Sequence, residues 1–357
     1  MRRIGMYEIA KLANVSIGTV GRALNGHGRI NEETRERIQQ IAHDLGYKPN
    51  LAARALSGAK GFRIGVCIPR ELHFFYDYIR QGILNEARRY EHLGLDILYR
   101  PVDRLGEGEI EKVKELLAND VRTLILTPGD TKRITPWIDK AEQQGVKVVC
   151  VASDAPASNR SSVVCVNPEL AGRFAGELMG RLLPAKSQVA IFTGMLQTED
   201  HYKKVQEFSE LLPQLCQGAK IVEVIEGHED EDETFAKCVD LLRRFKKLSG
   251  IYVSTVNCLP VCRALRSVGL AGKVKLITTD LFREMAPYFE NGTIAASIYQ
   301  RPYMQGQVAV RLMVDHLISG RAIPSTFYLN PNIVLRSNLG LFREMREVEQ
   351  PEAMATL

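Results

Sequence analysis

Cysteine is scarce in this 357-residue sequence, and the cysteines that are present form no recognisable binding pattern. Seven is an odd number, and closely spaced pairs of the zinc-binding kind do not occur, which argues against both a disulfide framework and a zinc ribbon. Cys67, Cys150 and Cys165 lie in apolar runs, where a reduced cysteine acts as a small hydrophobic residue. Cys258 and Cys262 are four residues apart and fit one helical face, so packing is favoured over a redox role.

Motifs for enzyme chemistry and for membrane insertion are also missing. No apolar run is long enough to cross a bilayer, and the start shows no secretory succession of charged, apolar and small residues. The sequence has no glycine-rich dinucleotide or phosphate loop, no Gly-x-Ser-x-Gly elbow and no His-Glu-x-x-His pair. We therefore expect a cytoplasmic protein that is not an enzyme, with no catalytic residue, metal site or cofactor, and no contact with a membrane.

Charge is distributed unevenly along the chain. The formal net charge is +5, yet residues 1–63 hold eleven Lys or Arg against five Asp or Glu, a surplus of six, so residues 64–357 carry −1. A basic segment of this kind is typical of a phosphate-binding surface. The acidic run from His228 to Glu233 is interpreted as a solvated turn that leads acids into a helix start, in preference to a cation site.

The basic segment has the pattern of three short helices. Two sets of apolar residues at helical spacing come first: Ile9, Ala10 and Ala13, then Val20, Ala23 and Leu24. Asn14 tolerates the left-handed conformation that a turn between them needs, and Ser16 is placed to cap the second helix. A third helix is predicted after Asn31 as N-cap, with the stripe Thr34, Ile38, Ile41, Ala42 and Leu45. The spacing indicates a helix-turn-helix, in which the second helix enters the major groove.

Further signature residues extend through the first sixty positions. In fixed order they are Tyr7-Glu8-Ile9-Ala10, Val15-Ser16, Thr19-Val20, Arg22, Leu24-Asn25-Gly26, Thr34-Arg35, Leu45-Gly46-Tyr47-Lys48-Pro49-Asn50 and Ala53-Arg54-Ala55-Leu56. This segment resembles the N-terminal domain of LacI/GalR-type bacterial transcription regulators. Two positions depart from the family pattern, because Asn14 stands where Gly is usual and Gly21 where Ser is usual. The second departure removes a hydroxyl contact to phosphate.

Contacts with DNA are expected at the start of the second helix. We expect Ile17 against a thymine methyl, Thr19 on a phosphate and Arg22 in a bidentate contact with a guanine, whereas Gly18 has no side chain to read bases. Residues 49–61 are interpreted as a linker that is too short to be helical alone and becomes helical on a partner. The resemblance implies a hinge helix here that inserts Leu56 into the minor groove, although an ordinary linker is the alternative. With those above, the DNA-binding residues implied are Tyr7, Ser16, Asn25, Asn50, Ala53 and Leu56.

From Phe62 onwards short apolar runs alternate with amphipathic helical patterns. Strands are predicted at 63–68, 95–99, 123–127, 147–151, 162–166, 188–193, 220–225, 250–254, 274–278 and 295–298, and helices at 76–92, 109–119, 168–183, 202–216, 233–246 and 304–319. This alternation indicates parallel sheets covered on both faces. Ten strands over roughly 280 residues exceed one core, so two lobes are expected.

This part of the chain resembles the periplasmic-binding-protein-like effector domain of the same family. The fold class predicted for the chain is therefore α/β, a small all-α helix-turn-helix domain followed by a two-lobed domain with two parallel Rossmann-like sheets. The predicted domains are the helix-turn-helix at 1–48, the hinge or linker at 49–61, the effector-binding and dimerisation domain at 62–340 and a tail at 341–357. Lobe 1 is expected at about 62–160 and 290–325, and lobe 2 at about 161–289 and 326–340.

Candidate ligand-binding residues lie where the predicted strands end, because ligands of open α/β sheets bind there. Asp130 and Asp280 each follow an apolar strand, although Asp280 could cap a helix. Asn257 and Gln300 offer both a donor and an acceptor, as a polyol needs. By the resemblance, Phe74 and Phe75 would stack on a sugar ring. The alternative that both belong to the hydrophobic core is equally favoured. Lys204 would replace an arginine whose forked contact lysine cannot reproduce.

Together these features predict a sequence-specific DNA-binding transcriptional regulator, a repressor, whose operator affinity is set by a sugar-like or polyol effector. The partners expected are double-stranded DNA with a near-palindromic operator, the effector and a second copy of the chain, with a tetramer left open. An activator of the same architecture is the main alternative. A sugar-binding protein without DNA function is a weaker one, because it would not need residues 1–60. The expected location is the bacterial cytoplasm, in association with the nucleoid.

Overall fold

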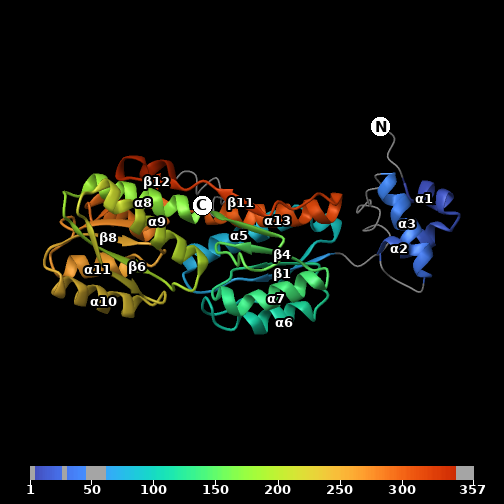
Figure 1. Cartoon of the computed structure of the whole chain (residues 1–357), viewed down its shortest axis with the longest axis horizontal. Helices are drawn as coiled ribbons and strands as arrows, with labels where there is room; N and C mark the ends of the chain where they lie inside the picture. Colours follow the sequence, from blue (N-terminus) through green and yellow to red (C-terminus); the bar gives the residue numbers. More distant parts are fainter. Residues whose placement is uncertain (1–4, 26–29, 46–61, 343–357) are drawn as a thin grey trace, which may run out of the picture. The chain divides into compact units, whose positions relative to one another are not determined.

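The structure, a computed structural model of the chain, describes residues 5–25, 30–45 and 62–342 (Figure 1). It divides into two compact units, Met1–Ala59 with Val314–Ala322 and Lys60–Met313 with Ile323–Leu357, and each is described by itself. The predicted linker at 49–61 and the tail from 343 lie outside the described residues. No helix in the described ranges is long and apolar enough to cross a membrane.

The small unit contains the three predicted helices, and we call these three helices together the head. They are α1 (Met6–Ala13), α2 (Ile17–Asn25) and α3 (Glu32–Asp44). Asn14 is left-handed at φ 51°, and Ser16 Oγ accepts from the Thr19 amide at 3.1 Å, so the predicted turn and cap are both confirmed. Asn31 likewise caps α3 by accepting from the Glu33 amide at 3.0 Å. The apolar residues of the three helices form one small core that includes Ile9, Ala13, Val20, Ala23, Ile38 and Ala42.

The large unit, which we call the body, contains two six-stranded sheets. Lobe 1 has the strand order β11 (Thr326–Leu329), β5 (Ser162–Val166), β4 (Lys147–Val151), β3 (Thr123–Leu126), β1 (Arg63–Cys67) and β2 (Asp96–Tyr99). Lobe 2 has the order β12 (Asn332–Val334), β10 (Ile294–Tyr299), β9 (Lys275–Thr279), β8 (Leu248–Val253), β6 (Gln188–Thr193) and β7 (Lys220–Glu226). All neighbouring strands are parallel except the pair β10 and β12, which is antiparallel.

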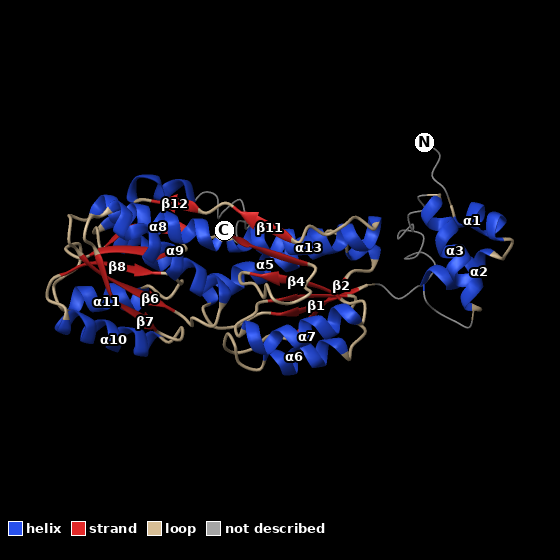
Figure 2. Cartoon of the chain, in the orientation of Figure 1, coloured by secondary structure: helices blue, strands red, loops and turns tan. Residues whose placement is uncertain are grey.

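Helices cover both faces of each sheet, as Figures 1 and 2 show. In lobe 1, α5 (His73–Arg88) and α13 (Pro302–Ser319) lie on one face, and α6 (Glu109–Leu117) and α7 (Thr131–Gln143) on the other. In lobe 2, α8 (Pro168–Leu182) and α9 (Glu199–Leu215) lie opposite α10 (Glu231–Arg244) and α11 (Leu259–Ser267). The short α12 (Ala286–Glu290) precedes β10. The central strands are therefore almost wholly buried, and the α/β fold predicted from their apolar runs is confirmed.

The chain passes between the lobes later than the predicted boundaries near 160, 290 and 325. Strand β5 belongs to lobe 1 and β10 to lobe 2, so the chain changes lobe after Val166 and again after Tyr299. Strand β11 then completes lobe 1 before β12 returns to lobe 2. The reason is that each strand runs to its carboxyl end before the chain leaves the sheet. Both β11 and β12 were missed from the sequence, because they are short and half-exposed and carry no continuous apolar run.

Candidate functional sites

The exposed side of helix α2 carries a row of polar side chains. Ser16 Oγ lies 2.9 Å from Thr19 Oγ1, and Arg22 donates from Nη2 to the same Thr19 oxygen at 3.3 Å. Ile17 beside them is 47% exposed, and Gly18 leaves that face without a side chain. The hydroxyls and the guanidinium are thus free to exchange these weak mutual contacts for phosphate oxygens or base edges.

Not every predicted DNA-binding residue can be placed on this surface. Tyr7 projects from α1 and is 67% exposed, and Asn25 is the last residue of α2. Asn50, Ala53 and Leu56 lie outside the described residues, so the minor-groove contact stays a prediction.

A second candidate site is a small cavity between the two sheets of the body, with a volume of about 30 Å³. Its walls come from both lobes, mostly from loops and helix starts that follow strand carboxyl ends. That volume holds only a few water molecules, so this conformation is contracted around the site. The lining residues are Leu72, Phe75, Tyr76, Leu105, Ala152, Ser153, Thr198, Asp200, His201, Lys204, Glu229, Thr255, Val256 and Gln300.

Lys204 is the centre of a buried polar network on the lobe 2 side of the cavity. Its ammonium group donates to Asp200 Oδ2 and to Gln300 Oε1, both at 2.6 Å, and lies 3.5 Å from the Ser254 carbonyl oxygen. Gln300 Nε2 in turn donates to Asp280 Oδ2 at 3.2 Å. The side chain of Lys204 is 1% exposed, so its charge depends on these partners for stabilisation.

Glu229 and His201 form a second polar group beside this network. Thr255 Oγ1 donates to Glu229 Oε2 at 3.2 Å, and His201 Nε2 lies 3.6 Å from Glu229 Oε1, which is beyond hydrogen-bond range. Burial, followed by the charge of Glu71, raises the pKa of Glu229 to about 8. Burial lowers the pKa of His201 to about 4. Both side chains are therefore predominantly uncharged at pH 7.

Backbone strain is concentrated around the same cavity. Leu72, Ala152 and Glu229, which line it, have φ values of 50°, 67° and 58°. Asp280 and Arg301, which follow β9 and β10, are left-handed at 69° and 55°. Because a left-handed conformation costs a non-glycine residue about 1–2 kcal/mol, such residues collect where their geometry serves a site.

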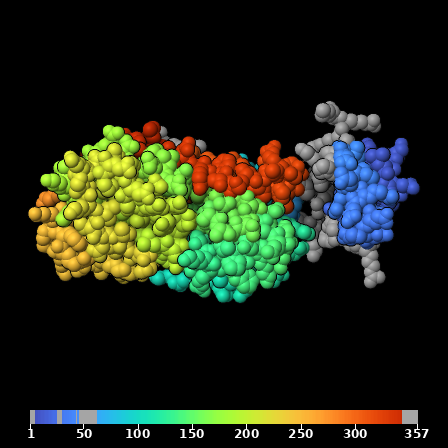
Figure 3. Space-filling model, in the orientation of Figure 1, coloured from blue at the N-terminus to red at the C-terminus, as the bar shows by residue number. Residues whose placement is uncertain are grey.

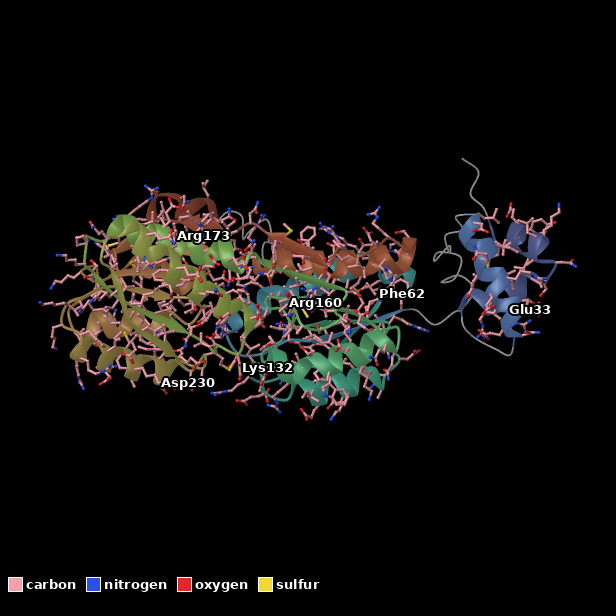
Figure 4. The ribbon with its side chains drawn as sticks, in the orientation of Figure 1. Glu33, Phe62, Lys132, Arg160, Arg173 and Asp230 are labelled. Carbon is pink, nitrogen blue, oxygen red and sulfur yellow. The ribbon has the colours of Figure 1, made fainter. Side chains whose placement is uncertain are left out.

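Contacts between the lobes close over the cavity in this conformation. Thr198 Oγ1 of lobe 2 donates to the Gly129 carbonyl oxygen of lobe 1 at 2.7 Å. Phe74 of lobe 1 stacks on Phe282 of lobe 2, with ring centroids 4.3 Å apart. Arg104 of lobe 1 pairs with Asp230 of lobe 2 at 3.3 Å, and Asp230 is labelled in Figure 4. The surfaces of the two lobes meet on the face drawn in Figure 3. A ligand larger than a few waters must therefore enter before these contacts form.

The structure brings together three of the seven predicted ligand residues, since Phe75, Lys204 and Gln300 line the cavity. Asp280 lies behind Gln300 and orients its amide, and it also accepts from the Leu281 amide at 3.0 Å. The remaining three predicted residues, Phe74, Asp130 and Asn257, do not line the cavity, and each already has structural contacts. Phe74 stacks on Phe282, Asp130 caps α7 by accepting from the Lys132 and Arg133 amides, and Asn257 donates to the Asp230 carbonyl oxygen and Thr234 Oγ1.

Several lining residues were missed from the sequence. Ser153 lies two residues after the end of strand β4, a position that could have been noted with Asp130. Glu229 belongs to the acidic run that we interpreted as a solvated turn. That interpretation holds for Asp230, which caps α10, but is wrong for Glu229, which is 8% exposed. Asp200 and His201 open α9 one turn before Lys204, and helical spacing alone did not reveal which face they share.

Metal binding finds no support in the parts of the chain that are described. There, no group of three or more His, Cys, Asp or Glu side chains could hold an ion. All seven cysteines are buried free thiols, in agreement with the packing role predicted for them.

Comparison with known families agrees with this two-part architecture. Residues 64–322 match the family of periplasmic binding protein domains, which spans well over half of the chain. Residues 5–50 match the bacterial regulatory proteins of the lacI family. Catabolite control protein A from Priestia megaterium is 26% identical over 318 residues, covering 88% of this chain and 92% of that protein. Its namesake from Staphylococcus aureus is 29% identical over 209 residues, covering 57% of this chain and 58% of that protein.

Solved structures resemble the larger part of the chain. A glucose-galactose binding protein from Geobacillus stearothermophilus has a TM-score of 0.72 at 25% identity, covering 78% of this chain and 99% of that protein. An ABC transporter solute binding protein from Burkholderia graminis, in complex with D-arabinose, has a TM-score of 0.73 at 24% identity, covering 79% and 97%. The second likeness bears on the fold alone.

Proposed function

Since this chain belongs to the periplasmic binding protein domain family and carries a lacI-type DNA-binding domain, we propose that an effector bound between its lobes controls its affinity for an operator. The chain is homologous to regulators named catabolite control protein A. In our proposal it acts as a repressor on the nucleoid, in the bacterial cytoplasm, and performs no catalysis. The observation that carries the proposal is the strained, polar cavity between two sheets in a chain whose head presents Ser16, Thr19 and Arg22 to solvent.

At the DNA end, two subunits of a homodimer place their α2 helices in successive major grooves, so the operator is a near-palindrome. Arg22 pairs with a guanine, Ile17 contacts a thymine methyl and Thr19 binds phosphate. The exposed row on α2 supports these roles, because its polar groups already point away from the head core.

At the effector end, the ligand is a small sugar-like or polyol molecule. Asp200, Gln300 and Thr255 of lobe 2 and Ser153 of lobe 1 bring polar groups to the cavity, and Phe75 and Tyr76 supply apolar walls. The glucose-galactose binding protein of similar fold supports this ligand class.

Coupling between the two ends runs through residues 49–61. Closure of the lobes around effector sets the separation of the paired linkers, and with it whether both Leu56 side chains can enter the minor groove. Such coupling is worth about 1–3 kcal/mol, or roughly 5- to 150-fold in operator affinity.

The experiment begins with selection of bound duplexes from a random pool by the full-length protein. We expect enrichment of a near-palindrome, whose affinity is then measured by fluorescence anisotropy with and without sugars and polyols. Arg22→Ala serves as the control that should lose the enriched motif. A pool that stays random contradicts the DNA half of the proposal, whereas an enriched operator that no ligand affects contradicts the effector half.

A further inference from the structure

The positive charge in the cavity is already fully engaged. An ammonium group has three donors, and those of Lys204 are taken up by Asp200 Oδ2, Gln300 Oε1 and the Ser254 carbonyl oxygen. Lys204 is the one Lys or Arg among the described residues that line the cavity. A phosphate or carboxylate on the ligand would therefore meet no free cationic donor on this wall.

Two residues that line the cavity, in contrast, have a polar atom without a partner. Asp200 Oδ1 and Ser153 Oγ are buried and have no hydrogen-bond partner among the residues that the structure describes. Asp200 is 7% exposed and Ser153 is 3% exposed, so water outside the protein cannot serve them. A buried carboxylate oxygen without a donor is costly, and the ligand is the available source of that donor.

Carboxyl groups also outnumber cations around the cavity. Glu229 lines it, and Glu71, whose side chain accepts from the Leu105 amide at 2.7 Å, lies just before the lining residue Leu72. The pKa of Glu71 is raised to about 7, chiefly by burial. Neutral His201 offers no compensating charge to Glu229, because its Nδ1 accepts from the Met195 amide at 3.1 Å. Burial, more than any charge, therefore favours the protonated form of Glu229 and Glu71.

We propose that the effector carries a basic amine, as in an amino sugar or amino polyol, whose ammonium group pairs with Glu229 and with the free oxygen of Asp200. Its hydroxyl groups bond Ser153 Oγ and Thr255 Oγ1. This inference rests on the proposed function and narrows its ligand class. Binding transfers the proton of Glu229 to the solvent, so that a carboxylate faces the ammonium group in the closed cavity.

The test is isothermal titration calorimetry of the full-length protein at pH 7 with ligand pairs that differ at one group. Glucose is compared with glucosamine and glucose 6-phosphate, galactose with galactosamine, mannose with mannosamine, and pentaerythritol with Tris. We expect the amine to bind about tenfold or more tightly than its hydroxyl partner in the series that fits best, and the phosphate to bind most weakly.

Proton release separates this pairing from mere shape complementarity. Titration of the best amine in phosphate and in HEPES, which differ in ionisation enthalpy, should reveal release of up to about one proton. The groups that face Glu229 are Glu71 before α5, Tyr76 on α5, and Asp200, His201 and Lys204 on α9. Glu71→Gln removes one of them without touching the pairing group, so it should reduce the proton release and keep the amine preference.

Glu229→Gln should bring the amine and its hydroxyl partner to within about threefold of each other and abolish the proton release. Glu223→Gln is the matched control, because Glu223 lies on strand β7, just before the turn that holds Glu229, but pairs with Arg244 at the surface. If the neutral sugars bind as tightly as their amines, this inference is overturned while the proposed function stands. If no member of any series binds, the inference falls together with the effector half of the proposed function, whereas the DNA half is tested separately by the duplex selection.

Discussion

The exposed face of the head and the cavity of the body satisfy their polar groups in opposite ways. On the head, Ser16, Thr19 and Arg22 lie on one exposed helix and bond one another, so each can accept water or DNA at small cost. In the cavity, Lys204 and Asp200 are buried and pair with each other within α9, and Lys204 also depends on the distant Gln300. If one partner of the pair is removed, the remaining charged group stays buried, with neither a partner nor water to stabilise it. The head can therefore be altered one residue at a time, whereas the cavity responds as a unit.

The largest expected effect comes from breaking the buried ion pair between Lys204 and Asp200. Lys204→Met keeps the shape of the side chain but leaves the Asp200 carboxylate unpaired in the interior, which should lower the free energy of unfolding of the body by about 3–5 kcal/mol. Denaturant unfolding followed by circular dichroism and by the fluorescence of Trp137, the single tryptophan, measures this loss.

Two further variants test whether the unpaired Asp200 carboxylate causes this loss of stability. Lys204→Met combined with Asp200→Leu removes both charges and should recover most of the stability. Arg181→Met breaks a similarly short pair with Glu177, 2.7 Å long but on the surface, and should cost under about 0.5 kcal/mol. If the double variant is no more stable than Lys204→Met alone, the uncompensated carboxylate is not the cause.

Next in size is the corresponding change on the head. Arg22→Ala should weaken discrimination between operator and random DNA by about 1–3 kcal/mol, because a bidentate contact to a guanine is lost. The free energy of unfolding should stay within about 0.5 kcal/mol, since Arg22 is exposed and bonds only Thr19. Anisotropy titrations with both duplexes at one salt concentration measure the first quantity, and unchanged discrimination would remove Arg22 from base reading.

The same contrast explains what could be predicted from the sequence. The head is built from local signals, such as the left-handed turn at Asn14 and the caps Ser16 and Asn31, and these act within a few residues. The apolar runs of the body similarly predicted ten of its twelve described strands, because a strand buried on both faces has a continuous apolar pattern. The two missed strands, β11 and β12, lie at sheet edges as β2 and β7 do, but they are short and largely exposed and carry no continuous apolar run.

The cavity was harder to predict because its residues meet only through the fold. Asp280 and Asn257 follow strands as a ligand residue would, yet Asp280 orients Gln300 and Asn257 fixes the Asp230 loop. Glu229, which does line the cavity, follows a strand in the same way and was hidden among neighbouring acids that are exposed. Position after a strand thus selects the correct edge of the sheet but not the direction of the side chain.

A smaller effect is expected from pH, through Glu229. Its pKa of about 8 exceeds the ordinary value of 4.5, so the folded body binds this proton more tightly than the unfolded chain does. The free energy of unfolding then falls as pH rises towards 8, and Glu71, with a pKa of about 7, adds in the same sense. His201 opposes this below its ordinary value of 6.5, because its pKa is lowered to about 4.

Between pH 6.5 and 8 the carboxyl groups therefore dominate, and we expect a loss of roughly 1–2 kcal/mol. Denaturant unfolding at several pH values measures the slope. Glu229→Gln should flatten it, while Glu223→Gln on the preceding strand β7 should leave it unchanged. A Glu229→Gln variant that retains the full slope would assign the effect to other groups.

The smallest effect distinguishes two helical glycines, one in each region. A Cβ at Gly21 of α2 would meet nothing within 4 Å, so Gly21→Ala should stabilise the head by about 0.5–1 kcal/mol through helix propensity. A Cβ at Gly172 of α8 would lie 2.5 Å from the Lys204 carbonyl oxygen, so Gly172→Ala should destabilise the body, because backbone must move. Hydrogen exchange of peptides from α2 and α8 in the full-length protein measures both changes. If Gly21→Ala stabilises its helix and Gly172→Ala destabilises its own, the exposed face of the head tolerates substitutions that the helices behind the cavity do not. Stability changes of the same sign would contradict this difference between the two regions.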